Sequence, residues 1–248
     1  MRLLPWATIV VAIVWSGAAG CASRGARAGA AAASTRPASM QPTPKVETEN
    51  ALEGAWRSVI GLASGNTPLK FVRMMEDTRS ADRRRQGIYG LVARDFGQRE
   101  PYTRRYRQIA QADADFTVRA AAIRALNWSR DTQAVSVFIA ALTDQNELVR
   151  WEAAKALANV PDPTAADPLT RALGNANESK NVRIAAADAL RHHRTLAAAR
   201  ALVNTLEGRD FGVAWQARRS LRRITGRDLR YDERSWLQFL TGPEKPLG

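Results

Sequence analysis

Apolar residues recur at helical spacing in segments that return along the chain at a nearly constant distance. Four nine-residue segments align without gaps: VRAAAIRAL (118–126), VRWEAAKAL (149–157), VRIAAADAL (182–190) and VAWQARRSL (213–221). Their starts lie 31 to 33 residues apart, and a weaker copy begins at Arg83. A period of this length, made of helical segments, is typical of proteins built from stacked repeats.

Each copy carries its apolar side chains on one side of a helix. In the copy at 149–157 these side chains fall within about 100° of one another on a helical wheel; they are Val149, Ala153, Ala156 and Leu157. Another amphipathic stretch precedes every copy, and these stretches begin at Pro68, Pro101, Thr132, Thr164 and Thr195. Neither helix can cover its apolar stripe alone, so the pattern predicts about five stacked helix pairs with the core between them.

Both ends of the repeat array carry a segment that fits a capping helix. At the C-terminal end Asp232 is a candidate N-cap, and the side chains that follow it on one face are Trp236, Leu237 and Leu240. At the N-terminal end a similar segment spans 51–63. No stretch alternates apolar and polar residues as a half-buried strand does. We therefore predict an all-α fold, with the repeat array over residues 51–240 and a tail over 241–248.

The central copies resemble the HEAT-repeat family, in particular the HEAT-like repeats of phycobilin lyases. The family motif has an Asp in the turn before the second helix and an Arg six positions later. Three copies carry this pair, with Asn in place of Asp in the third: Asp113 with Arg119, Asp144 with Arg150, and Asn177 with Arg183. The resemblance implies a right-handed α-solenoid, and it specifies the fold better than the activity because such repeats are scaffolds.

One position of the copies, opposite the apolar stripe, holds large apolar side chains in three consecutive repeats: Trp151, Ile184 and Trp215. Neighbouring positions hold arginines, among them Arg191, Arg219 and Arg222. In the family that the copies resemble, second helices line the concave surface. Since Trp and Arg are frequent in binding hot spots, these residues form a candidate partner-binding face. The alternative is that they lie sideways against adjacent second helices and complete the packing.

The first twenty residues have the layout of a secretory signal. An apolar run at 3–15 is followed by small residues and then by Cys21, the single cysteine of the chain. The run is shorter than the roughly 20 residues that span a bilayer. Because residues 18–21, Ala-Ala-Gly-Cys, resemble the bacterial lipobox, we predict cleavage after residue 20 and lipidation of Cys21. The alternatives are ordinary secretion with an incidental cysteine and an uncleaved anchor.

The segment from Ala22 to residue 50 is rich in Ala, Ser, Thr, Pro and Gly and has no apolar period. Such a composition cannot bury enough apolar surface to fold, so we interpret residues 21–50 as a lipidated, disordered tether. Ala22, directly after the cysteine, favours the outer membrane in the sorting pattern that this sequence resembles. The predicted location is therefore the periplasmic side of a membrane, and the outer one if the organism has two.

Charge is high and uneven along the chain. The formal net charge is +13, from 37 Lys and Arg against 24 Asp and Glu. The excess lies at the two ends of the repeat array, in residues 79–107 and 218–230, whereas residues 131–180 are mildly acidic. This distribution indicates either a solvated, Arg-rich surface or a surface that binds anionic lipid or a cell-envelope polymer. Export argues against nucleic acid as the partner.

The residues that most enzymes require are scarce. One cysteine excludes an internal disulfide framework, and the two histidines, His192 and His193, are adjacent. Adjacent residues of a helix point about 100° apart, so the two rings are poorly placed to bind one metal ion. The chain has no Walker-type glycine loop and no Gly-x-Ser-x-Gly segment. We expect no catalytic activity, no metal and no cofactor.

Together these features predict a non-catalytic scaffold, tethered to a membrane, that holds a protein partner in its concave groove. The alternative function is electrostatic binding of anionic lipid or cell-envelope polymer through the Arg-rich ends. The oligomeric state and the identity of the partner do not follow from the sequence.

The predicted lipid attachment has a direct test. Cells that express the chain and are labelled with a fatty acid should yield labelled protein, and the Cys21→Ser variant should carry no label, because the thioether bond needs the thiol. Label that persists in Cys21→Ser would show that the attachment site lies elsewhere.

Overall fold

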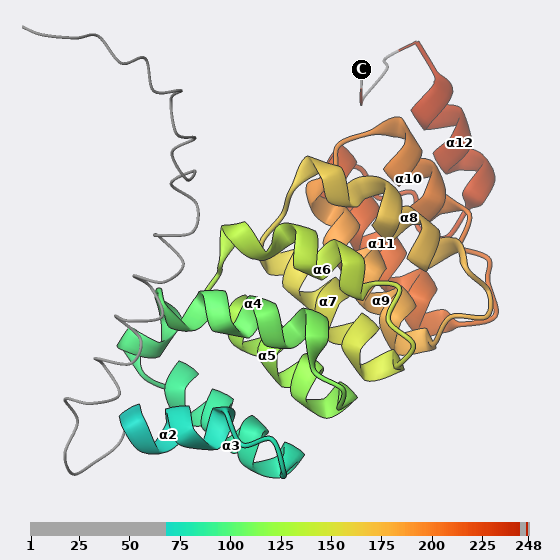
Figure 1. Cartoon of the computed structure of the whole chain (residues 1–248). Coiled ribbons are helices and arrows are strands. Elements are labelled where there is room, and N and C mark those ends of the chain that lie inside the picture. The colour runs from blue at the N-terminus through green and yellow to red at the C-terminus, as the bar shows by residue number, and fades with distance from the viewer. Residues whose placement is uncertain (1–67, 244–246, 248) are drawn as a thin grey trace, which may run out of the picture. The chain divides into compact units, whose positions relative to one another are not determined.

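The computed structural model describes residues 68–243 and Leu247, and helices are the regular structure of this part of the chain (Figure 1). Eleven α-helices are present in it and no strand, so the predicted all-α fold is confirmed. The predicted signal peptide, Cys21, the tether and the capping segment 51–63 lie outside the described residues. No helix within the described residues is long and apolar enough to cross a bilayer.

The helices follow one another as five pairs and a final single helix. The pairs are α2 (Pro68–Met75) with α3 (Ala81–Val92), α4 (Tyr102–Ala112) with α5 (Phe116–Trp128), α6 (Val135–Ala141) with α7 (Glu147–Asn159), α8 (Ala166–Gly174) with α9 (Lys180–Ala189), and α10 (Leu196–Val203) with α11 (Phe211–Thr225). The single helix is α12 (Glu233–Thr241). Four 3₁₀ turns accompany them: η1 (Asp95–Gln98), η2 (Thr132–Ala134), η3 (Pro163–Ala165) and η4 (Leu190–His192).

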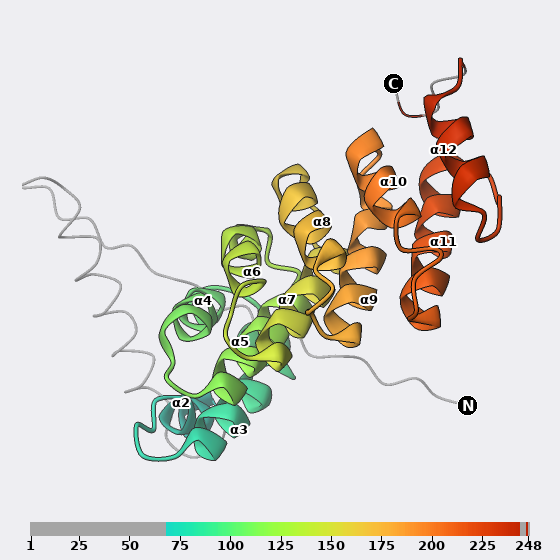
Figure 2. The same ribbon diagram turned by 90° about the vertical axis from the view of Figure 1, so that its right-hand side faces the viewer.

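The second helices of the pairs lie side by side in one layer, and the first helices form the other (Figures 1 and 2). Consecutive second helices contact one another more extensively than consecutive first helices do. A stack of repeats curves toward its more closely packed layer. The second helices, α3, α5, α7, α9 and α11, therefore form the layer on the concave side of the stack. We call the side of this layer that faces solvent the inner face.

The core lies between the two layers and runs without a break through all five pairs. The first residues of the three best copies, Val118, Val149 and Val182, are completely buried. Alanines fill the contacts between second helices, and in α7 Ala153 and Ala156 are also completely buried. Small side chains at these positions allow the second helices to approach one another closely, which explains the alanine-rich repeat.

The second helices begin at polar residues that bind free backbone N–H groups. The capping side chains accept hydrogen bonds from N–H groups two or three residues later; they are Ser80, Asp115, Asn146 and Ser179. Each such cap stabilises a helix by about 0.5–2 kcal/mol. At α11 the capping residue, Asp210, makes no bond of this kind, and its carboxylate instead contacts an arginine of the preceding repeat.

Helix α12 closes the C-terminal end of the stack. It packs beside α10, in the place that the first helix of another pair would occupy. Trp236 is completely buried there, and its Nε1–H donates to the carbonyl oxygen of Arg230 at 3.1 Å. The side chain of Asp232 accepts from the N–H of Ser235 at 3.2 Å, as expected for an N-cap. The last repeat is therefore covered.

The first pair is held by a very close approach of α2 and α3. A Cβ atom added at Gly87 would lie 2.3 Å from the backbone nitrogen of Met75 and 2.5 Å from the carbonyl oxygen of Phe71. Backbone atoms cannot yield as a flexible side chain does, so glycine is required here. At Gly174, the last residue of α8, an added Cβ would meet nothing within 4 Å.

These two glycines provide a matched test of the packing. Gly87→Ala should destabilise the first pair by about 1–3 kcal/mol, since it forces α2 away from α3. Hydrogen exchange of the amides in α2 and α3 should be faster in this variant. Gly174→Ala should leave exchange in α8 unchanged or slow it, because alanine favours a helix over glycine. Equal effects of the two substitutions would contradict the close approach.

Candidate functional site

A row of ion pairs joins each repeat to the next, and we call it the ion-pair ladder. Its cations are the fourth residues of four consecutive second helices, and its anions lie in the turn of the following repeat. The pairs are Arg84 with Asp113, Arg119 with Asp144, Arg150 with Glu178, and Arg183 with Asp210. The first three are bidentate, with N–O distances of 2.7 to 2.9 Å, and the fourth has a single contact of 3.2 Å.

The same arginines also bind the backbone of their own repeat. Nη1 of Arg119 donates to the carbonyl oxygen of Asp113 at 2.9 Å, and Nη1 of Arg150 donates to that of Asp144 at 2.8 Å. Arg84 donates in the same way to the carbonyl oxygen of Asp77 at 3.0 Å. One guanidinium therefore connects two consecutive turns, through a carbonyl on one side and a carboxylate on the other.

The ladder differs from the pairing that the sequence motif suggests. Asp and Arg of one copy, such as Asp113 and Arg119, meet through the backbone carbonyl, whereas the carboxylate of Asp113 binds the arginine one repeat earlier. In the repeat with Asn177 the anion is the next residue, Glu178. The last repeat lacks the arginine but keeps an anion, Asp210. A search for any acid in each turn finds all four anions.

Ionisation of the ladder carboxylates is favoured by their arginines. Burial raises the pKa of Asp144, but the hydrogen bonds from Arg119 and from the N–H of Asn146 outweigh it, and the net pKa is lowered. Burial, the hydrogen bond from Arg150 and that from the N–H of Ser179 act on Glu178 in the same way, again with a lowered pKa. Both carboxylates therefore remain charged well below neutral pH.

A second polar contact crosses the inner face between α5 and α7. Glu152 is completely buried, and its carboxylate accepts hydrogen bonds from Arg124 and from Nζ of Lys155, the latter at 3.2 and 3.3 Å. Arg124 also donates to the hydroxyl of Tyr89 at 3.3 Å. Two cations compensate the buried anion, which makes Glu152 a structural residue of the face.

The three large apolar residues of the predicted face have different surroundings. Trp151 is half-buried against the core, with Nζ of Lys155 4.1 Å from its ring centroid. Ile184 also packs on the core, and a Cβ added at Gly212 of α11 would lie 3.2 Å from its Cδ1. Trp215 is 47% exposed, with Arg219 5.5 Å from its ring centroid. Ile184 thus packs against the next repeat and Trp151 is partly covered by the core, whereas Trp215 is open.

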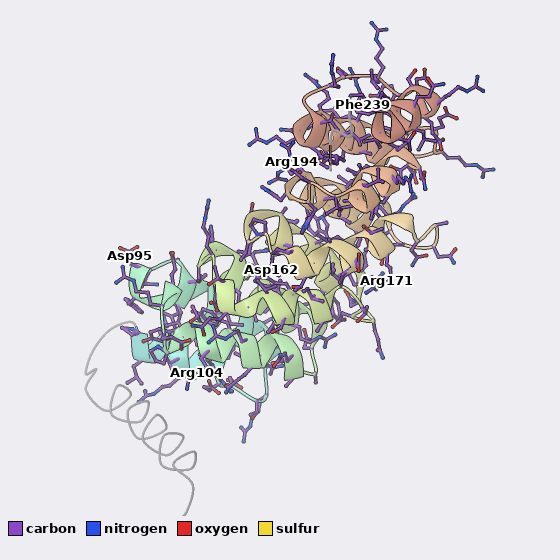
Figure 3. The ribbon with its side chains drawn as sticks, turned by 90° about the horizontal axis from the view of Figure 1, so that it is seen from above. Asp95, Arg104, Asp162, Arg171, Arg194 and Phe239 are labelled. Carbon is purple, nitrogen blue, oxygen red and sulfur yellow. The ribbon has the colours of Figure 1, made fainter. Side chains whose placement is uncertain are left out.

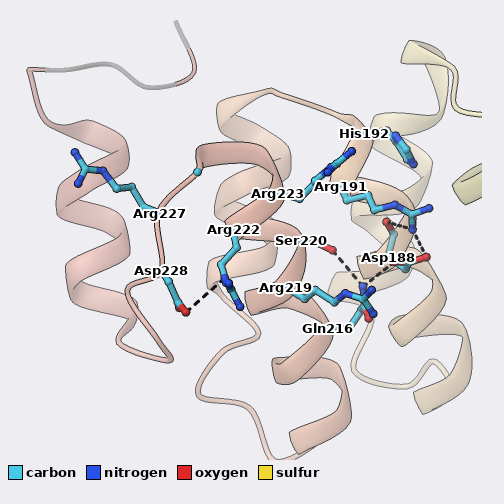
Figure 4. A pocket seen from close by; sticks show the side chains of 11 residues that line it. Asp188, Arg191, His192, Gln216, Arg219, Ser220, Arg222, Arg223, Arg227 and Asp228 are labelled. Carbon is cyan, nitrogen blue, oxygen red and sulfur yellow. Dashed lines mark hydrogen bonds and ion pairs between the residues drawn. The ribbon is translucent and has the colours of Figure 1, made fainter.

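The candidate arginines of the face gather in one pocket at the C-terminal end of α11 (Figure 4). Arg191, Arg219 and Arg222 line it together with Arg223 and Arg227, and its volume is about 820 Å³. Helix α11 ends at a glycine with a left-handed backbone, and the chain then turns back so that Asp228 binds Arg218 and Arg222. Repeat positions alone did not reveal Arg223 and Arg227, although both lie in the basic run 218–230.

The N-terminal basic run is largely neutralised. Six of its arginines form ion pairs with nearby acids: Arg83 with Asp77, Arg84 with Asp113, Arg85 with Asp82, Arg104 and Arg107 with Glu100, and Arg105 with Glu76. In the C-terminal run the pairs are those of Arg218 and Arg222 with Asp228. Arg219, Arg223 and Arg227 have no carboxylate partner among the described residues. The excess positive charge is therefore concentrated at the C-terminal end.

The two histidines have different environments. His192 is exposed at the edge of the pocket, whereas His193 is buried and its Nε2 lacks a hydrogen-bond partner among the described residues. Desolvation lowers the pKa of both rings, of His193 because it is buried and of His192 because the protein covers part of its ring, and Arg191 lowers that of His192 further. The described part of the chain holds no group of three or more His, Cys, Asp or Glu side chains arranged to bind a metal ion.

Comparison with known proteins supports the assignment of the helix pairs as HEAT-like repeats. The sequence model of the family described as HEAT repeats matches residues 104–179, and the predicted resemblance to that family is confirmed there. A search of curated proteins finds no match.

Two solved structures show the same fold. One is the complex of CpcE and CpcF of phycocyanin lyase from Nostoc sp. PCC7120, at 20% identity and a TM-score of 0.58, covering 73% of each chain. The other is an engineered protein from the Northeast Structural Genomics Consortium, at 19% identity and a TM-score of 0.50, covering 74% of this chain and 92% of that one. At these identities the likeness concerns the fold alone.

Acid should weaken the ladder. The folded-state pKa of Asp144 lies below its unfolded value, so the stabilisation is present above the unfolded pKa of about 3.9 and is lost as the pH falls through the lower folded-state value. Asp144→Asn should reduce the free energy of unfolding at pH 7 by about 1–3 kcal/mol, with a smaller difference at pH 2–3. Urea titrations at both pH values measure this.

The control for this test is Glu207→Gln, which removes an exposed carboxylate that has no ion pair among the described residues. It should change the stability little at either pH. A constant loss in Asp144→Asn across the pH range would mean that the Arg119–Asp144 charge pair does not stabilise the fold.

Proposed function

We propose that this protein is a non-catalytic scaffold, tethered to a membrane, that binds a protein partner on the inner face of its HEAT-like repeats. The observation that carries the proposal is the open Trp215, which lies beside Arg219 on the last second helix. Trp and Arg dominate the hot spots of protein interfaces, where a large rigid ring is buried and a guanidinium donates at its edge.

The arrangement of the inner face supports binding rather than chemistry. Its buried carboxylate, Glu152, is held by Arg124 and Lys155, and the ladder carboxylates are held by arginines. Asp144 and Glu178 have lowered pKa values, and the carboxylate of Glu152 is occupied by Arg124 and Lys155, so these acids are held in contacts within the fold. The likeness to a lyase complex at 20% identity concerns the fold, and it does not extend the chemistry of that complex to this chain.

Tethering is the second part of the proposal. It rests on the apolar run, the small residues and the single Cys21 near the N-terminus. A lipidated cysteine followed by a flexible segment would hold the repeats near the periplasmic side of a membrane, and the outer one in an organism with two. A partner on the same membrane would then meet the inner face at a raised effective concentration.

The test replaces the open tryptophan in the full chain. Trp215→Ala should reduce capture of a partner by cross-linking in cells at least tenfold, because hot-spot truncations cost about 2 kcal/mol or more. The matched control is Trp128→Ala, which removes a tryptophan that is 62% exposed at the end of α5. Its capture should equal that of the unchanged chain.

Circular dichroism of both variants should show the helical fold, since neither ring is part of the core. An unchanged set of cross-linked proteins in Trp215→Ala, or an equal loss in both variants, would reject Trp215 as the centre of the binding surface.

A further inference from the structure

We propose that the pocket at the C-terminal end of α11 binds a phosphate group through Arg191, Arg219 and Arg223. We call it the arginine pocket. This site goes beyond the partner-binding face, since Arg223 is not part of that face. The ligand is either a soluble phosphate compound or the phosphate of a lipid headgroup, which present the same chemistry to the pocket.

The first argument is convergence. The three arginines come from two segments, η4 and α11, which pack against each other. Figure 4 shows Arg223 beside Arg191 and His192, with Arg219 on the next turn of α11 near Gln216. All three line one pocket of about 820 Å³ that is open to solvent.

The second argument is charge. Five arginines and two aspartates line the pocket. Both aspartates are occupied: Asp228 accepts from Arg218 at 2.7 and 2.9 Å, and Asp188 pairs with Arg191 and accepts from Gln216 at 2.7 Å. Neither is available to neutralise the remaining arginines. The lining therefore carries a net positive charge, and a bound anion would relieve the repulsion between its cations.

The third argument concerns the unpaired arginines. Arg219 and Arg223 have no carboxylate partner among the described residues, and Arg219 stacks on Trp215 instead. Arg227 lies over the ring of Phe239 at 5.9 Å. Most arginines of the N-terminal basic run do have such partners, so the difference is local to this pocket. Arg191 differs, because it pairs with Asp188 and its Nη2 donates to the carbonyl oxygen of Ala158 at 3.1 Å, so it adds its charge and its remaining N–H groups. N–H donors without a carboxylate partner are what a multiply charged oxyanion needs.

The pKa of the neighbouring His192 is affected by two of these arginines. Burial lowers the pKa of His192, and Arg191 and Arg223 lower it further, partly opposed by the carbonyl of Ala158 and by Asp188. Arg191 and Arg223 thus add to desolvation in lowering the pKa of His192, in agreement with the net positive lining of the pocket.

The chemistry favours phosphate over carboxylate. A carboxylate offers two oxygens in one plane, which a single guanidinium can satisfy. A phosphate or pyrophosphate group offers three or more oxygens that point in different directions. A phosphate group carries up to two negative charges, and pyrophosphate carries more. Guanidinium groups that approach from different helices match that geometry better than one fork does.

The experiment uses the full chain and two probes. Inorganic pyrophosphate, titrated by calorimetry at low salt, tests a soluble ligand. Co-sedimentation with phosphatidylcholine vesicles that contain phosphatidate, against phosphatidylcholine alone, tests a lipid headgroup and cancels any contribution of an acyl anchor. Binding of at least one probe is expected, with weakening as salt is raised, since exposed charges are screened.

Arg223→Gln should lower the affinity for the bound probe about tenfold, in line with the loss of one charged hydrogen bond. The matched control is Arg171→Gln on α8, which makes the same charge change at an exposed arginine outside the pocket (Figure 3). Its affinity should stay within about twofold, as a surface charge away from the site contributes little.

The outcomes separate the sources and the two proposals. Binding of pyrophosphate lost in Arg223→Gln identifies a soluble phosphate compound, and binding of phosphatidate vesicles alone, lost in the same variant, identifies a headgroup. No binding of either probe, or an equal loss in Arg223→Gln and Arg171→Gln, overturns the site. Partner capture should survive Arg223→Gln and fail in Trp215→Ala, so failure of one proposal does not imply failure of the other.

Discussion

The structure depends on apolar stripes that no helix pair can cover by itself. Each second helix buries one side against its own first helix and a further strip against the second helices before and after it. Alanines such as Ala153 and Ala156 keep that strip thin, and the close approach at Gly87 serves the same end in the first pair. The stability of each repeat therefore depends on its neighbours. Helix α12 covers the apolar surface that the last repeat would otherwise expose to solvent.

The ion-pair ladder fixes the position of each repeat relative to the next. Apolar contacts are tolerant of small shifts, whereas a bidentate pair such as Arg119 with Asp144 is satisfied only in one relative placement of two turns. Because the same guanidinium binds the carbonyl of Asp113, each repeat is positioned against the next by both its backbone and its side chain. The ladder ends at Arg183 with Asp210, because the fourth residue of α11 is Ala214 rather than an arginine.

Both proposed binding sites lie where the repeat pattern ends. Trp215 is open because no further second helix follows α11 among the described residues, while Ile184 lies against α11 of the next repeat and Trp151 is partly buried on the core. Arg219, Arg223 and Arg227 have no carboxylate partner among the described residues, since Asp228 in the turn after α11 pairs with Arg218 and Arg222, and Asp232 caps α12. The exposure of Trp215 and the unpaired arginines of the pocket are thus both found at the last repeat of the array.

Local spacing was sufficient to predict the helix pairs, their number and the buried valines, since a period near 32 residues and an apolar stripe are properties of the chain itself. The partner of each ladder arginine was not predictable from spacing within one copy, because the carboxylate comes from the next copy and its residue type varies between Asp and Glu. Which of Trp151, Ile184 and Trp215 is exposed was likewise decided by the neighbour that each one has in space. The arginine pocket required the chain to turn back after Gly226, and only the folded structure brings those distant charges to one place.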